Sequence, residues 1–261
     1  PKSKSILGYS PNATLKCVHE IVITQNARFE KIYSALLQEL DEQKIHFINE
    51  KQLNSEQTEF IKNYFHSEVR TRLMPFLIEK DSELPNLTDD AIYLAIIMHK
   101  KGTDRKRYDL LEIPTDVLPR FILLPEIGDN KYIIYLDDII RFGLKDIFSI
   151  FDFDDFAAYT TKLTKDAELE IADDISESYI DKLSKSLHQR KWGSPVRFIY
   201  DKKMPVDLLK ILTRIFNFGP VDVIIPAERY HNLKDFMRFP NLGKKKFYFE
   251  PFIPVPHKEI L

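Results

Sequence analysis

Five basic side chains in two short stretches are the residues of this sequence most able to contact an anion. They are Lys162, Lys165, Arg229, His231 and Lys234. In a regular strand Lys162 and Lys165 point to opposite faces, so both reach one polyanion only if the strand ends or bulges between them. The plainer alternatives are solvated lysines at a strand end, and a histidine that hydrogen-bonds a helix terminus or a neighbouring loop.

Neither a catalytic residue nor a metal ligand is expected in this chain. Phosphoryl transfer needs positive charge around the oxygens, a bound metal and an in-line nucleophile, and the sequence offers only patches of the first. Cys17 has no partner cysteine, and no histidine pair has the H-E-x-x-H spacing of a zinc site. The histidines without a motif around them are expected to be structural or exposed: His19, His46, His66, His99, His188 and His257.

Two acidic stretches are given structural interpretations. Asp152, Asp154 and Asp155 alternate with phenylalanines. This pattern predicts a turn whose rings point inward and whose carboxylates stay in water, rather than a magnesium site. Asp137 and Asp138 are expected to open a helix, where negative charge offsets the helix dipole.

The composition limits the classes of protein to consider. The 261 residues include 38 basic and 40 acidic side chains, so no global field favours nucleic acid or membranes. A single cysteine excludes an intramolecular disulfide and fits a reducing, cytoplasmic compartment. No signal-peptide pattern, membrane-spanning run or glycine-rich nucleotide loop is present. Because the chain starts with Pro1 rather than Met, it is expected to be a piece of something longer.

The order of elements predicts an α+β fold with a mixed sheet and packed helices, preceded by a long amphipathic helix at about 13–43. A capping box at Asn54 and Gln57 predicts the start of a second helix, which ends near Met74. Further helices are expected at 136–148 and from Asp174 onward. Strands are expected at 45–48, 91–98, 107–113, 120–124, 132–135, 159–164 and 244–249.

A β-α-β unit is the clearest local pattern. Residues 196–201 alternate as a strand, a helix runs from Pro205 to a stop at Gly219, and residues 221–225 read as a second, buried strand. A short polar and aromatic helix is expected over 229–236.

Seven short motifs follow one another along the chain: Leu111–Asp116, Pro119–Phe121, Leu136–Arg141, Thr164–Glu168, Pro195–Phe198, Arg229–Phe236 and Phe239–Asn241. In this order they resemble the head domain of the long, histidine-phosphorylating polyphosphate kinases, from about Ile45 to Lys245. Arg229–Phe236 carries the resemblance most clearly. Lys165 stands where the family usually has arginine, which keeps the charge and loses the planar bidentate fork.

The resemblance implies that the whole protein reversibly transfers the terminal phosphate of ATP to polyphosphate through a phosphohistidine, with magnesium. It implies the end of an N-terminal helical domain at 1–43, the head at 44–250 and a linker at 251–261. The nucleophilic histidine would lie beyond Leu261, so this fragment alone is expected to be inactive and to bind no ATP or magnesium.

The implied partners are the chain's own C-terminal catalytic domains, polyphosphate and further copies in a homodimer or higher homo-oligomer, without nucleic acid or a transmembrane segment. The expected location is the cytoplasm, with the inner face of the membrane as a peripheral site. An alternative is a non-catalytic oligomerisation or interaction module with no ligand contact, and a third is an unrelated interaction domain that shares only the fold.

Overall fold

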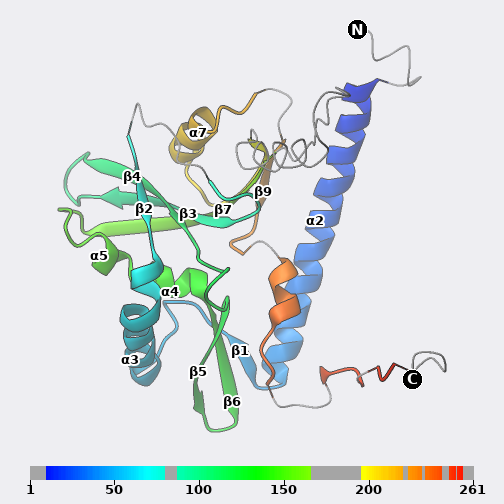
Figure 1. Cartoon of the computed structure of the whole chain (residues 1–261), viewed down its shortest axis with the longest axis vertical. Coiled ribbons are helices and arrows are strands. Elements are labelled where there is room, and N and C mark those ends of the chain that lie inside the picture. The colour runs from blue at the N-terminus through cyan, green and yellow to red at the C-terminus, as the bar shows by residue number, and fades with distance from the viewer. Residues whose placement is uncertain are drawn as a thin grey trace, which may run out of the picture.

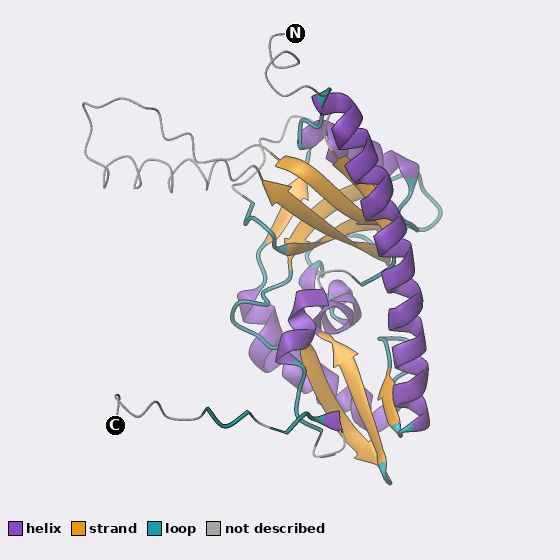
Figure 2. Ribbon diagram, turned by 90° about the vertical axis from the view of Figure 1, so that its right-hand side faces the viewer, coloured by secondary structure: helices purple, strands orange, loops and turns teal. Residues whose placement is uncertain are grey.

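In a computed structural model, a long helix, α2 (Pro11–Glu42), runs beside two β-sheets that lie one above the other (Figures 1 and 2). The structure describes residues 10–79, 87–165, 195–219, 223–230, 233–242, 247–250 and 252–254. The 32 residues of α2 make a rod about 48 Å long. Its C-terminal half contacts the rest of the molecule, where the hydroxyl groups of Tyr33 and Tyr135 lie 2.5 Å apart.

The larger sheet has six strands in the order β2-β4-β3-β7-β8-β9. All neighbours are antiparallel except β8 and β9, which are parallel and joined through α7 (Val206–Ile215). This is the predicted β-α-β unit. The strands are β2 (Pro75–Ile78), β3 (Ile92–His99), β4 (Lys106–Glu112), β7 (Asp155–Lys165), β8 (Pro195–Asp201) and β9 (Val223–Ala227).

The smaller sheet has three strands, β1 (Ile45–Phe47), β6 (Asn130–Tyr135) and β5 (Phe121–Ile127), in that spatial order. β5 and β6 form an antiparallel hairpin, and β1 pairs with β6 in parallel as the chain leaves α2. The division of the strands into two sheets is not visible in the sequence pattern, because alternation shows that a strand forms and not which strand it joins.

Buried apolar side chains lie on both faces of the larger sheet. Leu94, Ile96 and Met98 of β3 pack on one face with the helices around α4 (Leu136–Phe142), whereas Tyr93 and Ala95 pack on the other with α7. Figure 1 shows α7 on one side of this sheet and α3 (Ser55–Tyr64) and α4 on the other. A strand buried on both faces must be apolar throughout, which explains the continuous run in β3.

The capping box predicted at Asn54 and Gln57 is confirmed at the start of α3 (Ser55–Tyr64). A π-helical turn, η1 (Phe65–Val69), and a 3-10 turn, η2 (Arg70–Arg72), follow it. The helix predicted over 136–148 is instead two helices, α4 (Leu136–Phe142) and α5 (Leu144–Ile147), which meet at Gly143. A Cβ at that position would lie 2.1 Å from the ring of Phe65, so the contact requires glycine.

Other predictions differ from the structure in detail. β2 was not expected, and Phe247–Glu250, the described end of the strand predicted over 244–249, is not extended into a sheet. Helix α7 ends at Ile215, before the predicted stop at Gly219, because Asn217 takes a left-handed conformation with φ 54°. The short helix expected over 229–236 is a 3-10 helix, η3 (Leu233–Arg238). The helix expected from Asp174 lies outside the described residues.

Candidate functional site

The first turn of α4 carries two fully buried carboxylates, Asp137 and Asp138, where the sequence predicted only a favourable interaction with the helix dipole. Arg120, which immediately precedes β5, binds Asp137 through two parallel contacts, Nε–Oδ1 at 3.2 Å and Nη2–Oδ2 at 3.0 Å. The same guanidinium reaches Asp235 of η3 at 2.7 Å. Burial opposes ionisation of Asp137, but the two neighbouring arginines, Arg120 above all, outweigh burial and lower its pKa.

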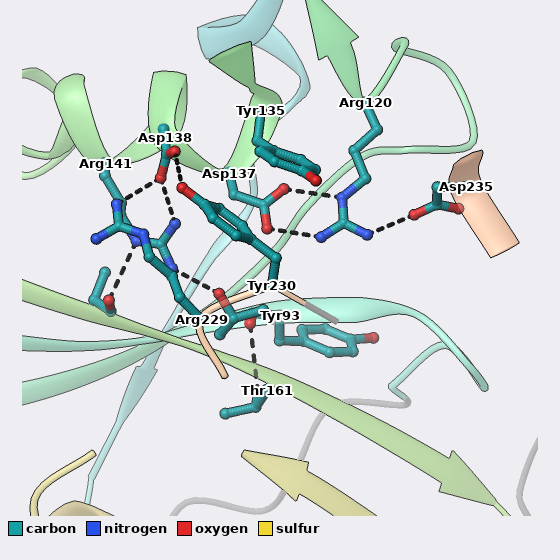
Figure 3. Close-up of polar contacts among 12 residues, drawn as sticks. Tyr93, Arg120, Tyr135, Asp137, Asp138, Arg141, Thr161, Arg229, Tyr230 and Asp235 are labelled. Atoms are coloured by element: carbon teal, nitrogen blue, oxygen red, sulfur yellow. Dashed lines mark hydrogen bonds and ion pairs between the residues drawn. The ribbon is translucent and has the colours of Figure 1, made fainter. Parts of the chain in front are cut away.

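Asp138 is the centre of a second group of contacts, drawn in Figure 3. Its Oδ1 accepts from Arg141 at 2.7 Å and from Arg229 at 2.6 Å, and its Oδ2 accepts from the Tyr230 hydroxyl at 2.6 Å. Arg141 continues to the Oγ1 of Thr160 on β7, 2.6 Å away. These contacts tie α4 to the larger sheet and to the segment after β9.

Asp90 forms ion pairs with two of the lysines that were predicted to contact an anion. The Nζ of Lys162 lies 2.5 Å from its Oδ1, and Lys234 of η3 donates to its Oδ2. Asp90 has φ 60°, a left-handed conformation that aspartate and asparagine tolerate better than most residues. Partial burial opposes its ionisation, but the two ammonium groups prevail and lower its pKa.

Lys165 reaches the same region through an irregularity in β7. The register with β8 shifts between Thr164 and Lys165. This shift lies between Lys162 and Lys165, where the strand had to end or bulge for both lysines to reach one anion. The backbone N–H of Lys165 donates to Asp89 Oδ1 at 2.8 Å, and its side chain is nearly buried. Burial lowers the pKa of this lysine, and the nearby Asp89 acts in the opposite direction.

A hollow of about 690 Å³ lies beside this group, between the turn before β3, the end of β4 and η3. Its lining includes Asp89, Asp90, Glu112, Asp116, Lys234, Asp235 and Arg238. The charged part of this lining is therefore mostly acidic, with five carboxylates and two cations. We refer to Asp89, Asp90, Lys162, Lys165 and Lys234 as the Asp90 cluster.

Of the five residues predicted from the sequence, Lys162, Lys165 and Lys234 belong to the Asp90 cluster. Arg229 lies elsewhere, against Glu50 at 2.5 Å and against Asp138. Its pKa is raised because these carboxylates outweigh the effect of burial. His231 falls outside the described residues.

Sequence reasoning did not find the acidic partners. Asp90 lies in a turn with no periodic pattern, so nothing local marks it. Arg120 and Asp137 lie in two of the motifs that carry the family resemblance, which was a signal, but their pairing depends on the packing of β5 against α4. His46 was assigned no partner, although it contacts both Asp41 and Asn130, and these contacts outweigh burial and raise its pKa.

The acidic stretch at 152–155 agrees with its structural interpretation. Phe151 and Phe153 pack against the core, and Asp152 is exposed and paired with Lys100 at 2.5 Å. Across the described ranges, no three His, Cys, Asp or Glu side chains are grouped as they would be around a metal ion. Within the same ranges, no helix combines the length and apolar character needed to cross a bilayer.

The α+β fold of this chain is already known from a solved structure. A solved structure of polyphosphate kinase from Porphyromonas gingivalis matches 98% of this chain with a TM-score of 0.74 at 24% sequence identity, over 36% of that chain. This similarity concerns the fold.

Sequence similarity then defines the family. The polyphosphate kinase middle domain matches residues 56–239. Polyphosphate kinase from Vibrio parahaemolyticus is 38% identical over 234 residues, which cover 88% of this chain and 33% of that protein. The Escherichia coli K12 protein of the same name is 38% identical over 259 residues, 98% of this chain and 36% of that protein. The chain belongs to the polyphosphate kinase family, as the motifs predicted, and spans about a third of the length of these relatives.

Proposed function

We propose that this chain is part of a polyphosphate kinase that reversibly transfers the terminal phosphate of ATP to polyphosphate through a phosphohistidine. In this proposal magnesium and ATP bind the whole enzyme, and the head supplies packing surface, dimer contacts and one wall of the polyphosphate path. One observation supports the proposed wall of the polyphosphate path: Lys162 and Lys234 both form ion pairs with the same carboxylate, Asp90.

Two ammonium groups that converge on a carboxylate are also placed to contact a phosphoryl oxygen. Asp90 holds Lys162 and Lys234 in position while no anion is bound, and a polyphosphate chain would compete with it for both. Lys234 is more than half exposed and Lys162 is largely covered, so the first can follow an incoming anion while the second stays fixed. Such binding must weaken as salt rises, because exposed charges are screened.

Polyphosphate binding by the purified chain at two ionic strengths tests this wall. Lys234→Gln is expected to weaken binding, and Asp90→Asn to strengthen it several-fold, because asparagine keeps the backbone conformation and removes the competing charge. Lys62→Gln, an exposed lysine of α3, is the matched control. If Asp90→Asn and Lys234→Gln both bind polyphosphate as Lys62→Gln does, the proposed wall of the polyphosphate path is refuted. No binding by any variant would favour the alternative of a scaffold without ligand contact.

The exposed face of α2 fits the proposed domain boundary near residue 43. Two groups of large apolar side chains are exposed on this face, and within each group the residues are three or four positions apart. They are Leu15 and Val18, and Phe29, Ile32 and Leu36. We propose that other helices of a preceding helical domain cover this stripe, since the relatives are about three times as long as this chain. Hydrogen exchange of α2 should slow in a longer version of the protein that includes that domain, and unchanged exchange would contradict this assignment.

The remaining parts of the proposal have separate tests. ATP-dependent synthesis of polyphosphate by residues 1–261 alone would refute the assignment of the nucleophile to the region beyond Leu261. Sedimentation over a range of concentrations tests the homo-oligomer, and a monomer at every concentration of the full-length protein would exclude it.

A further inference from the structure

A second hollow, of about 240 Å³, lies at the carboxyl ends of the two parallel strands β8 and β9. Asp201 ends β8 and Ala227 ends β9, and the segments that follow them contribute Lys203 and Arg229 to the lining. In open α/β sheets, ligands bind in the crevice outside the carboxyl ends of the parallel strands, and β8 and β9 are one such parallel pair within this mixed sheet. This hollow shares no lining residue with the one beside the Asp90 cluster, so it is a separate place on the molecule.

Four cationic side chains and two carboxylates line this second hollow. The cations are Lys51, Arg141, Lys203 and Arg229, and the carboxylates are Glu50 and Asp201. Asp138, which binds both arginines, compensates one further charge. One positive charge remains in excess. Arg141 is almost completely buried, so its attraction for an anion is screened by water less than that of a surface lysine.

Arg229 has a buried donor that its known partners do not use. Its Nη2 donates to Glu50 and Asp138, but its Nε is buried and has no hydrogen-bond partner among the residues that the structure describes. A buried N–H without an acceptor is unfavourable. A ligand oxygen that reaches the Nε from the hollow, by displacing the atoms that now cover it, would therefore be stabilised there. Asp201 does not fill this role, since the Nε contacts no acceptor among the described residues; Asp201 Oδ1 accepts instead from the backbone N–H of Lys203 at 2.9 Å.

We propose that this hollow binds a phosphate-type oxyanion, with Arg229 as the buried donor and Lys203 as the exposed counter-charge. Its volume is below the roughly 300–1,000 Å³ of pockets that enclose drug-sized ligands, so it fits a phosphate group rather than a whole nucleotide. Free phosphate and the end of a phosphate chain present the same group. The inference does not depend on the wall proposed at the Asp90 cluster.

Titration calorimetry of the chain with inorganic phosphate and with tripolyphosphate tests the site. Arg229→Lys keeps a charge for Glu50 and Asp138 but removes the planar Nε donor, and Lys203→Gln changes an exposed side chain. Each is expected to weaken binding about tenfold, the scale of one charge-assisted hydrogen bond. Lys62→Gln, at an exposed lysine that belongs to neither proposed site, is the control and should leave binding unchanged.

Saturable binding that both variants weaken and that Lys62→Gln retains supports the site. The anion that binds more tightly shows whether the site takes free phosphate or the end of a phosphate chain. The proposal is overturned if neither anion binds saturably, or if Lys234→Gln abolishes binding while Lys203→Gln does not. Circular dichroism shows whether Arg229→Lys is folded. If it is not, Lys203→Gln alone decides, because its side chain lies at the surface.

Discussion

Asp109 on β4 is a buried carboxylic acid whose replacement should change how the stability of the chain depends on pH. It is 1% exposed, pairs with Leu77 on one side and Ile96 on the other, and its Oδ1 has no hydrogen-bond partner within the described ranges. Burial raises its pKa from 3.8 to about 7, although a backbone contact with Phe76 acts in the opposite direction.

The sign of the effect follows from this pKa difference. Below about pH 4 the carboxyl is protonated in both the folded and the unfolded chain, so it has no effect on stability. Between about pH 4 and pH 7 unfolding releases a proton, so stability falls as the pH rises. Above about pH 7 the full penalty applies, and a change from 3.8 to about 7 corresponds to at most roughly 4 kcal/mol.

Urea denaturation of the wild-type chain and Asp109→Asn at about pH 5 and about pH 8 measures this penalty. The variant is expected to lose less stability between the two pH values and to be the more stable protein at the higher one. Asp104→Asn, an exposed carboxylate in the turn before β4, is the matched control and should follow the wild type. If the wild type and Asp109→Asn lose the same stability between the two pH values, the proposed penalty for ionising buried Asp109 is refuted.

Three further substitutions test the packing and ion pairs of this chain by urea denaturation. Gly143→Ala forces a Cβ against the ring of Phe65 and should cost about 1–3 kcal/mol; an unchanged midpoint would contradict the contact. Arg120→Met leaves Asp137 buried without its main counter-charge and should cost about 3–5 kcal/mol, of which Arg120→Met with Asp137→Leu should recover a large part. If the double substitution is no better than the single one, the pairing is not the cause. Asn54→Ala removes the cap of α3 and should cost about 1 kcal/mol, and no loss would contradict a stabilising cap.

The proposed anion contacts show why a site can be only half predicted. The residue types and strand spacing of Lys162 and Lys165 predicted an anion contact only if β7 ended or bulged between them, and the structure has a register shift just before Lys165. Asp90, which joins Lys162 to Lys234, was not predicted, because these two lysines are separated by the whole β-α-β unit and meet only when η3 packs beside the turn before β3.

The sequence by itself determined the features that depend on near neighbours. The capping box at Asn54 and Gln57 and the helical spacing of α7 are satisfied within a few residues, and hydrophobic periodicity records which face of an element is buried. Motifs in a fixed order were enough to place the chain in its family.

Only the tertiary structure decided which elements meet. Arg120 contacts Asp235, which is 115 positions away in the sequence, and Asp138 contacts Tyr230, which is 92 positions away. No local sequence pattern predicts either contact. The same holds for the division into two sheets, because strand pairing depends on contacts between distant segments. Asp137 and Asp138 are buried rather than exposed because folding brings arginines from outside the helix to carboxylates that would otherwise remain in water.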